Sequence, residues 1–467
     1  MPPSWTQPPN VAVVGGGLSG LAAGCALSEA GFRVTLFERR PYLGGRASSY
    51  EHSGTGEVID NCQHVLLGCC TNLIEFYERT GVDSNIRWFD RLTFLEPGGR
   101  ASEIGPSNWP APLHTTPAFL RAVCLRLPDK IAIARAMMAL APTTPRDTGE
   151  SFLSWLRRHG QTEGAIERFW KPVLVSALNE DVDRVAVPSA AQVMRESFLK
   201  SAGAGRMGVP AVPLTELYNA AGEYIRARQG TVRFRLAIDS FRADVSHVRL
   251  GMRDREERFD FVVFAVPFDV LGKLLPNSSA AEPLRSRLGR FETSPITGIH
   301  LWFDRNISDL DHAVLLDRTI QWMFHKSKLQ RRDNDGHGSY VELVVSASKS
   351  LVEKSKQDIV DLALSEFREF FPAAREANLV KATVIKEVHA TYSPRPGIEA
   401  DRPRPETVWP RVFLAGDWTA TGWPATMEGA VRSGYLAAQS LAKVAGLRDA
   451  SFLVPDLPAR GFMRIFG

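Results

Sequence analysis

Short apolar runs separated by glycine-rich breaks dominate the first forty residues of the chain. Residues 11–14 are apolar, residues 15–20 contain four glycines, and residues 21–30 are mostly small and apolar. A second strand-like run at 32–37 ends at Glu38. The pattern predicts a buried strand, a tight turn, a helix that closes at Gly31, and a second buried strand.

The glycines of this turn have the spacing GxGxxG, at Gly15, Gly17 and Gly20. Gly15 permits a tight turn, Gly17 lets a pyrophosphate approach the backbone, and Gly20 lets helix and strand pack closely. Glu38, eighteen residues beyond Gly20, has the right distance to accept hydrogen bonds from an adenosine ribose. No GKS or GKT follows, so a mononucleotide site fits less well. The N-terminus of the helix expected over 21–30 would supply unpaired N–H groups for the anion, and Leu18 and Ser19 within the turn are predicted cofactor contacts.

The remaining pattern alternates strand-like and helix-like stretches over the whole chain. A strand that turns at Asp60 is expected within 57–68, and residues 116–200 are expected to be mostly helical. The other predicted helices are 71–80, 214–228, 355–371 and 425–444, and the other predicted strands are 231–238, 259–266, 296–303, 320–325, 340–346, 384–392 and one starting at 412.

Two further motifs lie at opposite ends of the chain. Residues 43–46 read Leu-Gly-Gly-Arg, and residues 412–417, Val-Phe-Leu-Ala-Gly-Asp, precede Pro-Ala-Thr-Met-Glu-Gly-Ala at 424–430. With the glycine turn, this set resembles the superfamily of flavin-dependent amine oxidases and phytoene desaturases. The resemblance implies an α/β fold in which a Rossmann-type FAD-binding domain (1–70, 205–275 and 405–467) is interleaved with a substrate domain (71–204 and 276–404). The substrate domain would hold a mixed β-sheet and a helical segment.

The resemblance also implies roles for individual residues around a noncovalently bound FAD. The turn at Gly45 and Arg46 would touch the phosphates, Asp417 would hold the ribitol, and a backbone amide near Ile238 would meet the adenine. The turn 62–65 would lie against the isoalloxazine, and the last helix would point its N-terminus at the same ring. The predicted FAD contacts beyond Glu38 are Arg39, Gly45, Arg46, Gln63, His64, Val65, Ile238, Gly416, Asp417, Thr426 and Met427.

Composition narrows the class of protein. A net charge of +4 over 467 residues gives no support for nucleic-acid binding. The five cysteines form no CxxC pair and have no grid of histidines nearby, so neither a disulfide framework nor a metal site is expected. The first ten residues predict a loose tail without a secretory signal, and no apolar run reaches the ~20 residues needed to span a bilayer. We expect a cytoplasmic protein, with peripheral contact at the inner face of the cytoplasmic membrane as an alternative. The oligomeric state is not predicted.

A second GxGxxG string occurs at 203–208. Helix-like residues precede it and Pro210 and Pro213 follow it, whereas a nucleotide fold needs a strand before and a helix after. We therefore reject it as a nucleotide site. NAD(P)H has no Rossmann domain of its own here and is expected only as a transient reductant.

Two stretches point to a branch within the superfamily. Asp-Asn-Cys-Gln-His at 60–64 resembles the isoprenoid-acting enzymes more than the amine oxidases, and residues 414–434 resemble the squalene-associated desaturase-like group. Members of that group are hydroxysqualene dehydroxylases of hopanoid synthesis. The resemblance implies reductive removal of the allylic hydroxyl of hydroxysqualene, which gives squalene.

That reaction needs an acid, and the sequence offers two candidates. His64 is the first, although a histidine in this turn is as well suited to fixing loop geometry. Asp60 is the second, although an aspartate at a strand end more often holds a turn together. Cys62 stands where the family usually has glycine, which leaves the local backbone conformation open.

Three rival functions share the fold. A carotenoid desaturase would run hydride transfer in the oxidative direction. An amine oxidase would need two aromatic rings around the substrate nitrogen, and Tyr392 matches one position whereas Thr426 stands at the other. A prenyl-binding escort protein would have the same architecture without flavin chemistry. The presence of Glu38, Arg46 and Asp417 argues against an escort protein.

A lipid-resident substrate leads to the expectation of an apolar surface at the membrane. One candidate is the stretch 119–140, where basic and large apolar residues interleave, and the alternative is a solvated basic face over a core stripe. The other candidate is the tail 452–466, whose apolar residues are equally able to fold back onto their own domain.

Overall fold

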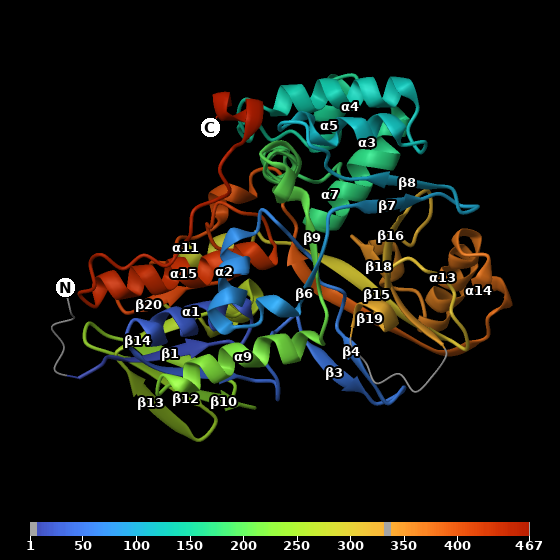
Figure 1. Ribbon diagram of the computed structural model, residues 1–467. Coiled ribbons are helices and arrows are strands. Elements are labelled where there is room, and N and C mark those ends of the chain that lie inside the picture. Colours follow the sequence, from blue (N-terminus) through green and yellow to red (C-terminus); the bar gives the residue numbers. More distant parts are fainter. Residues whose placement is uncertain (1–6, 331–337, 467) are drawn as a thin grey trace.

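A five-stranded parallel sheet contains the strands predicted around the glycine turn (Figure 1). The computed structural model describes residues 7–330 and 338–466, so residues 1–6 of the predicted tail lie outside the described part. The sheet has the order β10–β2–β1–β14–β20. Its strands are β1 (Asn10–Val14), β2 (Arg33–Glu38), β10 (Thr231–Phe234), β14 (Phe261–Phe264) and β20 (Val412–Leu414).

Successive side chains of β1 enter two different cores, because neighbours on a strand point to opposite faces. Val11 and Val13 pack against helices, whereas Ala12 and Val14 pack against a small antiparallel sheet. The helices are α1 (Leu18–Glu29), α2 (Thr71–Thr80), α9 (Leu214–Ala227) and α15 (Met427–Val444). The small sheet consists of β11 (Ser240–Ala243), β12 (Val248–Met252) and β13 (Arg255–Phe259), and α10 (Phe268–Leu274) and α11 (Glu282–Leu288) follow β14.

A seven-stranded mixed sheet forms the second half, in the order β19–β15–β18–β17–β16–β7–β8. Its central strands are nearly all buried, and α13 (Lys356–Phe370) covers one face. The strands are β7 (Leu92–Leu95), β8 (Ala101–Ile104), β15 (Thr293–Phe303), β16 (His312–Leu315), β17 (Trp322–His325), β18 (Ser339–Ser346) and β19 (Leu379–Tyr392), with short helices α12 (Lys326–Leu329) and α14 (Ala373–Glu376).

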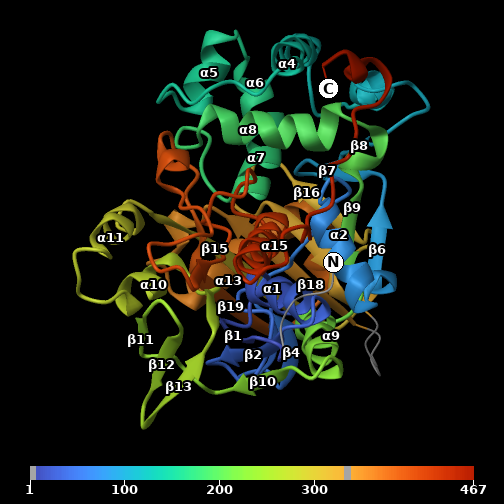
Figure 2. The ribbon, with the colours of Figure 1, turned by 90° about the vertical axis from the view of Figure 1, so that its left-hand side faces the viewer.

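The predicted helical middle is confirmed as a layer above the seven-stranded sheet (Figures 1 and 2). Phe94, Val314 and Leu316 at the end of the sheet share one core with these helices. The helices are α3 (Thr116–Arg121), α4 (Leu127–Leu140), α5 (Phe152–Arg158), α6 (Glu163–Ala165), α7 (Lys171–Leu178) and α8 (Val187–Met194), and five-residue π-helical turns follow α6 and α8.

Several predicted bounds need correction. The strand expected at 231–238 ends at Phe234, because Arg235 has a positive φ of 56°. The strand expected at 259–266 divides at Asp260 between two sheets, and Ile320 and Gln321 precede β17 instead of belonging to it. The rejected glycine string at 203–208 runs into strand β9 (Met207–Pro210). A nucleotide site would need a helix at this place, so the structure agrees with the rejection.

β9 pairs with β5 (Leu66–Leu67) and β6 (Ile86–Phe89), and a hairpin of β3 (Ser49–His52) and β4 (Glu57–Asp60) lies nearby. The strands of the five-stranded sheet all come from segments predicted for the FAD-binding domain, and those of the seven-stranded sheet from the other segments. The sheet β5–β9–β6 draws on both. We keep the division into two interleaved domains as a proposal.

Candidate active site

A cavity of about 390 Å³ lies at the carboxyl ends of the parallel strands, where α/β folds bind their ligands. Val14, Glu38, Ala265 and Gly416 line it from the ends of four strands. Every predicted FAD contact except Gly20 lies on its wall. These residues are Gly15, Gly17, Leu18, Ser19, Glu38, Arg39, Gly45, Arg46, Gln63, His64, Val65, Ile238, Gly416, Asp417, Thr426 and Met427.

Gly20 and Gly17 of the glycine turn are required for different physical reasons. A Cβ added at Gly20 would lie 1.9 Å from the carbonyl oxygen of Gly15, so Gly20 serves the packing of helix on turn and stays off the cavity wall. A Cβ at Gly17 would meet only the Cα of Gly45, at 3.9 Å. The protein's own packing does not require glycine there, and the space in front of Gly17 suits a pyrophosphate. Helix α1 begins at Leu18, earlier than predicted, so its free N–H groups face this space.

The Glu38 carboxylate is anchored before any ribose reaches it. Its Oε2 accepts the backbone N–H of Gly16 at 2.7 Å, and its Oε1 accepts the backbone N–H of Arg40 at 2.7 Å. The Arg40 guanidinium in turn donates to the carbonyl of Gly45 at 2.9 Å. Since a carboxylate oxygen can accept more than one hydrogen bond, Glu38 can hold the two phosphate-facing turns together and still receive the ribose hydroxyls.

Arg46 and Asp417 meet as an ion pair, with 2.8 Å between Nη2 and Oδ1. Arg46 also donates to the carbonyl of Ala390 at 2.6 Å. Burial by itself lowers the pKa of Arg46, but the neighbouring Asp417 raises it above the usual value. A permanent positive charge therefore stands beside the phosphate-facing turn, and the pair fixes the carboxylate that is expected to hold the ribitol.

Asp60 lies beneath the turn that follows β4 and is not on the cavity wall. Its carboxylate accepts hydrogen bonds from Ser49 Oγ (2.6 Å), the backbone N–H of Leu214 (3.1 Å), Lys326 Nζ (2.5 Å) and Gln330 Nε2 (2.8 Å). Burial alone would raise the pKa of Asp60, but the Lys326 ammonium and these hydrogen bonds lower it to about 2. The prediction that Asp60 is an acid catalyst is therefore wrong, because this carboxylate has no proton to give at neutral pH; it holds the turn.

Lys326 and Glu342 complete this buried cluster, and the sequence interpretation missed both. Lys326 is fully buried and also donates to Gln63 Oε1 at 2.7 Å, and Glu342 Oε1 accepts the backbone N–H of Gln63 at 2.5 Å. Burial raises the pKa of Glu342 to about 7, against the opposing charge of Lys326. Glu342 is the one charged residue of the buried strand β18, a signal that could have drawn attention to it.

His64 lies on the cavity wall with a defined tautomer. Its Nδ1 is 2.7 Å from the carbonyl oxygen of Cys62, so Nδ1–H donates and the neutral ring presents Nε2 as an acceptor. Burial lowers the pKa of His64, although the hydrogen bond to Cys62 opposes the shift. Burial also raises the pKa of the Cys62 thiol well above its usual value, which leaves it protonated and unreactive.

A second cavity of about 180 Å³ adjoins the first, and both are lined by Val65, Trp322 and Met427. Beyond these residues its wall is mainly apolar and comes from β7, α7, α8 and the loop before α15. Tyr392 is absent from both walls, because its ring is fully buried and packs edge-on against Phe291 at 5.5 Å. The proposed match of Tyr392 to an amine-oxidase cage ring is therefore wrong.

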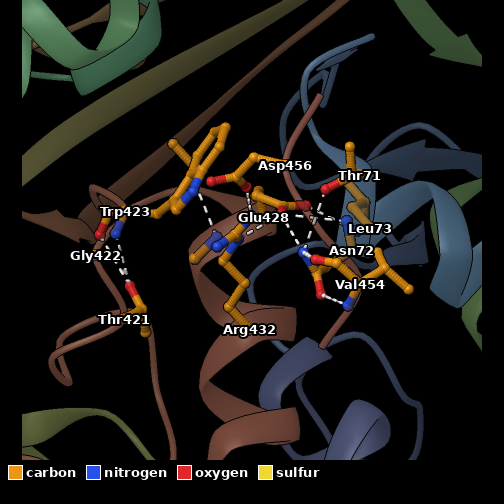
Figure 3. Close-up of polar contacts among 12 residues, drawn as sticks. Thr71, Asn72, Leu73, Thr421, Gly422, Trp423, Glu428, Arg432, Val454 and Asp456 are labelled. Atoms are coloured by element: carbon orange, nitrogen blue, oxygen red, sulfur yellow. Dashed lines mark hydrogen bonds and ion pairs between the residues drawn. The ribbon is translucent and has the colours of Figure 1, made fainter. Parts of the chain in front are cut away.

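A buried polar network fixes the start of α15, the helix that faces the first cavity (Figure 3). Glu428 is fully buried and accepts the backbone N–H of Leu73 at 2.7 Å, the side-chain amide of Asn72 at 3.1 Å and Arg432 Nε at 2.6 Å. Arg432 also pairs with Asp456 of the C-terminal tail. The Glu428 carboxylate thus joins the start of α15 to α2, and Arg432 and Asn72 connect this network to the tail.

A parallel sheet with a glycine turn, an anchored acid and an arginine at its carboxyl edge defines a dinucleotide-binding protein. Residues 18–442 match the family described as "Flavin containing amine oxidoreductase", and the chain belongs to that family. It is an FAD-dependent oxidoreductase.

Several known proteins are similar to this chain in sequence or in fold. The chain is 27% identical to a 15-cis-phytoene desaturase of Synechococcus elongatus, over 92% of this chain and 95% of that protein. It is 26% identical to a zeta-carotene desaturase of a Synechocystis strain, over 92% and 97%. A cyclohexylamine oxidase from Brevibacterium oxydans has a similar fold, with a TM-score of 0.68 at 16% identity over 95% of this chain and 100% of that one.

Replacing Lys326 by Met should destabilise the FAD-loaded protein by about 3–5 kcal/mol, because Asp60 would remain buried without its cation. The double variant Asp60→Asn/Lys326→Met should recover most of this loss, and Lys328→Met, on an exposed pair with Asp309, should cost less than about 1 kcal/mol. Urea unfolding measures all three. A Lys326→Met protein as stable as the wild type would show that the buried pair does not hold the turn.

Replacing Glu38 by Ala should weaken FAD binding by roughly tenfold to a hundredfold, since a charged acceptor contributes about 1.5–3 kcal/mol. The fluorescence of flavin released into the dialysis buffer measures how much FAD each variant retains. Glu51→Ala, an exposed acid on β3, is the matched control and should retain FAD as the wild type does. Equal retention in both variants would remove Glu38 from the cofactor site.

Proposed function

We propose that this oxidoreductase acts on a C30 isoprenoid and reductively dehydroxylates hydroxysqualene to squalene, in hopanoid or triterpenoid biosynthesis. The observation that carries the substrate class is the mainly apolar second cavity that joins the cofactor cavity at Val65, Thr426 and Met427. The choice of dehydroxylation rests on residues 414–434, which resemble the squalene-associated group.

The second cavity suits a long hydrocarbon. Leu73, Phe94, Val173 and Phe198 line it, and a chain of isoprene units needs apolar walls and few polar partners. A small polar amine would need compensating polar groups and aromatic rings, and the burial of Tyr392 elsewhere supports the isoprenoid over the amine.

The chain's own residues would hold the cofactor and handle the proton. FAD would lie with its phosphates between Gly17 and Arg46, its ribose on Glu38 and its ring beside the turn at His64. When bound and reduced, the flavin supplies a hydride to the substrate carbon. The protonated form of His64 would donate from Nε2 to the departing hydroxyl, which leaves as water. The apolar walls of the second cavity would keep bulk water from the reacting carbon.

The cofactor is proposed to bind noncovalently. The one cysteine on the wall beside the expected ring position, Cys62, is kept as a thiol by burial, and His64 already uses Nδ1 in a hydrogen bond. NAD(P)H is proposed as a transient external reductant.

A carotenoid-type desaturase is the second candidate. The names of the relatives from Synechococcus and Synechocystis favour it, and the same cavities would serve a longer polyene. In that direction hydride would leave the substrate, and His64 would act as a base, a role for which its lowered pKa is suited.

Anaerobic mixing distinguishes the two candidates. Photoreduced enzyme with hydroxysqualene should regain the oxidised flavin spectrum and form squalene, and oxidised enzyme with 15-cis-phytoene should remain unchanged. Desaturated product from phytoene, without squalene from hydroxysqualene, would assign the second candidate. Inactivity towards both would contradict the isoprenoid proposal.

If His64 is the acid, flavin reoxidation by hydroxysqualene should accelerate as the pH falls towards the lowered pKa of His64, about tenfold per pH unit above it. His64→Ala should slow the reaction by about 10²-fold or more, flatten this profile and keep FAD bound. His52→Ala, on β3, is the control. An unchanged pH profile with weaker FAD binding in His64→Ala would mean that the histidine only shapes the turn.

A further inference from the structure

The large hydrophobic side chains that remain exposed gather on one side of the molecule. Of the sixteen in the described residues, ten lie within 109–138 and 462–466. The other six are all valines, distributed from residue 58 to residue 444. A single exposed valine needs no explanation, but a contiguous set of Trp, Leu, Ile, Met and Phe marks an interaction site.

Two segments more than three hundred residues apart build this surface. The backbone N–H of Phe462 donates to the carbonyl of Ala111 at 2.8 Å, and Met463 is buried in one core with Ala111, Ala141 and Leu199. Figures 1 and 2 both show the C-terminal turn beside the end of α4. We name residues 109–138 and 462–466 the docking face.

Helix α4 is apolar on both sides. Ala132, Ile133 and Ala136 face the core, whereas Ile131 and Met138 on the opposite side are 53% and 66% exposed. Large apolar side chains this exposed, opposite the core side of a helix, are more than a solvated helix face needs. The outer side therefore carries exposed apolar side chains in addition to the basic residues expected from the sequence.

The charge of the docking face is entirely basic at its surface. Between residues 105 and 146 the one acidic residue is Asp129, which is buried and caps α4. Arg121, Arg126 and Arg135 are exposed there, and Arg464 is exposed among the last residues. Apolar side chains interleaved with cations are complementary to an anionic lipid surface, where the rings and alkyl chains enter the headgroup region and the cations remain at the phosphates.

We propose that the docking face seats the protein on an anionic lipid bilayer as a peripheral membrane protein. In the described residues no helix has the length and apolarity to cross a bilayer. The turn Arg195–Leu199 connects the face to the second cavity, because Phe198 lines that cavity and Leu199 packs beneath the face. Delivery of a lipid-resident substrate along this route rests on the proposed function, whereas membrane binding itself does not.

The C-terminal tail divides into a structural part and a docking part. Phe452 and Leu453 pack on the main core, Val454 donates to Asn72 at 3.0 Å, and Asp456 pairs with Arg432 (Figure 3). Deleting the whole tail would damage the fold, so exposed side chains are the proper targets.

Co-sedimentation of the FAD-loaded protein with vesicles tests the proposal without substrate. Wild-type protein should bind phosphatidylcholine vesicles that contain phosphatidylglycerol, and salt should weaken the binding. Ile131→Glu/Met138→Glu and Phe462→Ser/Ile465→Ser should each reduce binding by about tenfold or more. Val245→Glu/Val408→Glu places the same charges on exposed valines elsewhere and should bind as the wild type does. All variants should melt at the wild-type temperature.

Several results would overturn the proposal. They are absence of wild-type binding, face variants that bind as the wild type does, and equal loss in the valine control. Sedimentation velocity tests for a dimer. If the wild type forms a dimer that the docking-face variants dissociate, and does not bind vesicles, the docking face would be assigned to a second copy of the chain. Because no isoprenoid is present, vesicle binding and isoprenoid turnover can fail independently.

Discussion

The buried charge cluster around Lys326 joins the two halves of the molecule. Asp60 precedes the turn that borders the cofactor cavity, whereas Glu342 lies in β18 of the seven-stranded sheet and Lys326 begins α12, directly after β17 of that sheet. A fully buried ammonium is tolerated only where carboxylates and amide oxygens surround it, so the two sheets must meet in one relative position. The first cavity lies at the seam, by which we mean the boundary where the two sheets meet. Its geometry therefore depends on the contacts of Lys326 with Asp60 and Glu342.

The seam separates two chemical environments. On the side of the parallel sheet the wall offers backbone N–H groups, Glu38 and the Arg46–Asp417 pair, which suit phosphates and hydroxyls. On the side of the helical layer the wall is mainly apolar. Met427 lies where the two cavities meet, at the start of a helix that the buried Glu428 holds in place. This gradient is suited to a flavin beside a hydrocarbon.

The same helical layer that walls the second cavity leaves an apolar outer side. Helices α3 and α4 of this layer bury only one side in the core above the seven-stranded sheet. The side chains on the other side of α4 are therefore available to a partner, and the C-terminal turn extends the surface. The inner side of this layer is apolar, whereas its outer side combines exposed apolar side chains with exposed arginines.

The sequence alone predicted residues that the structure gathers on one cavity wall. Gly15, Gly17 and Glu38 could be predicted because their roles depend on local backbone geometry and fixed spacing, whereas Arg46 and Asp417 were implied by the resemblance to the flavin-dependent superfamily. Their contact with FAD stays a prediction. The α/β fold and most helices followed from hydrophobic periodicity, whereas short strands such as β6, β8 and β16 carried too few residues to show a period.

Only the tertiary structure decided which groups can carry a proton. Asp60 and Lys326 are 266 residues apart, and their contact fixes the ionisation of Asp60, so its sequence position gave no sign of its low pKa. The burial of Tyr392 and the exposure of Ile131 likewise depend on neighbours that are distant in the chain. The tautomer of His64 depends on the conformation of its own turn, which brings Nδ1 to the carbonyl of Cys62. Spacing within one segment encodes a turn, but pKa values and exposure are properties of the assembled surroundings.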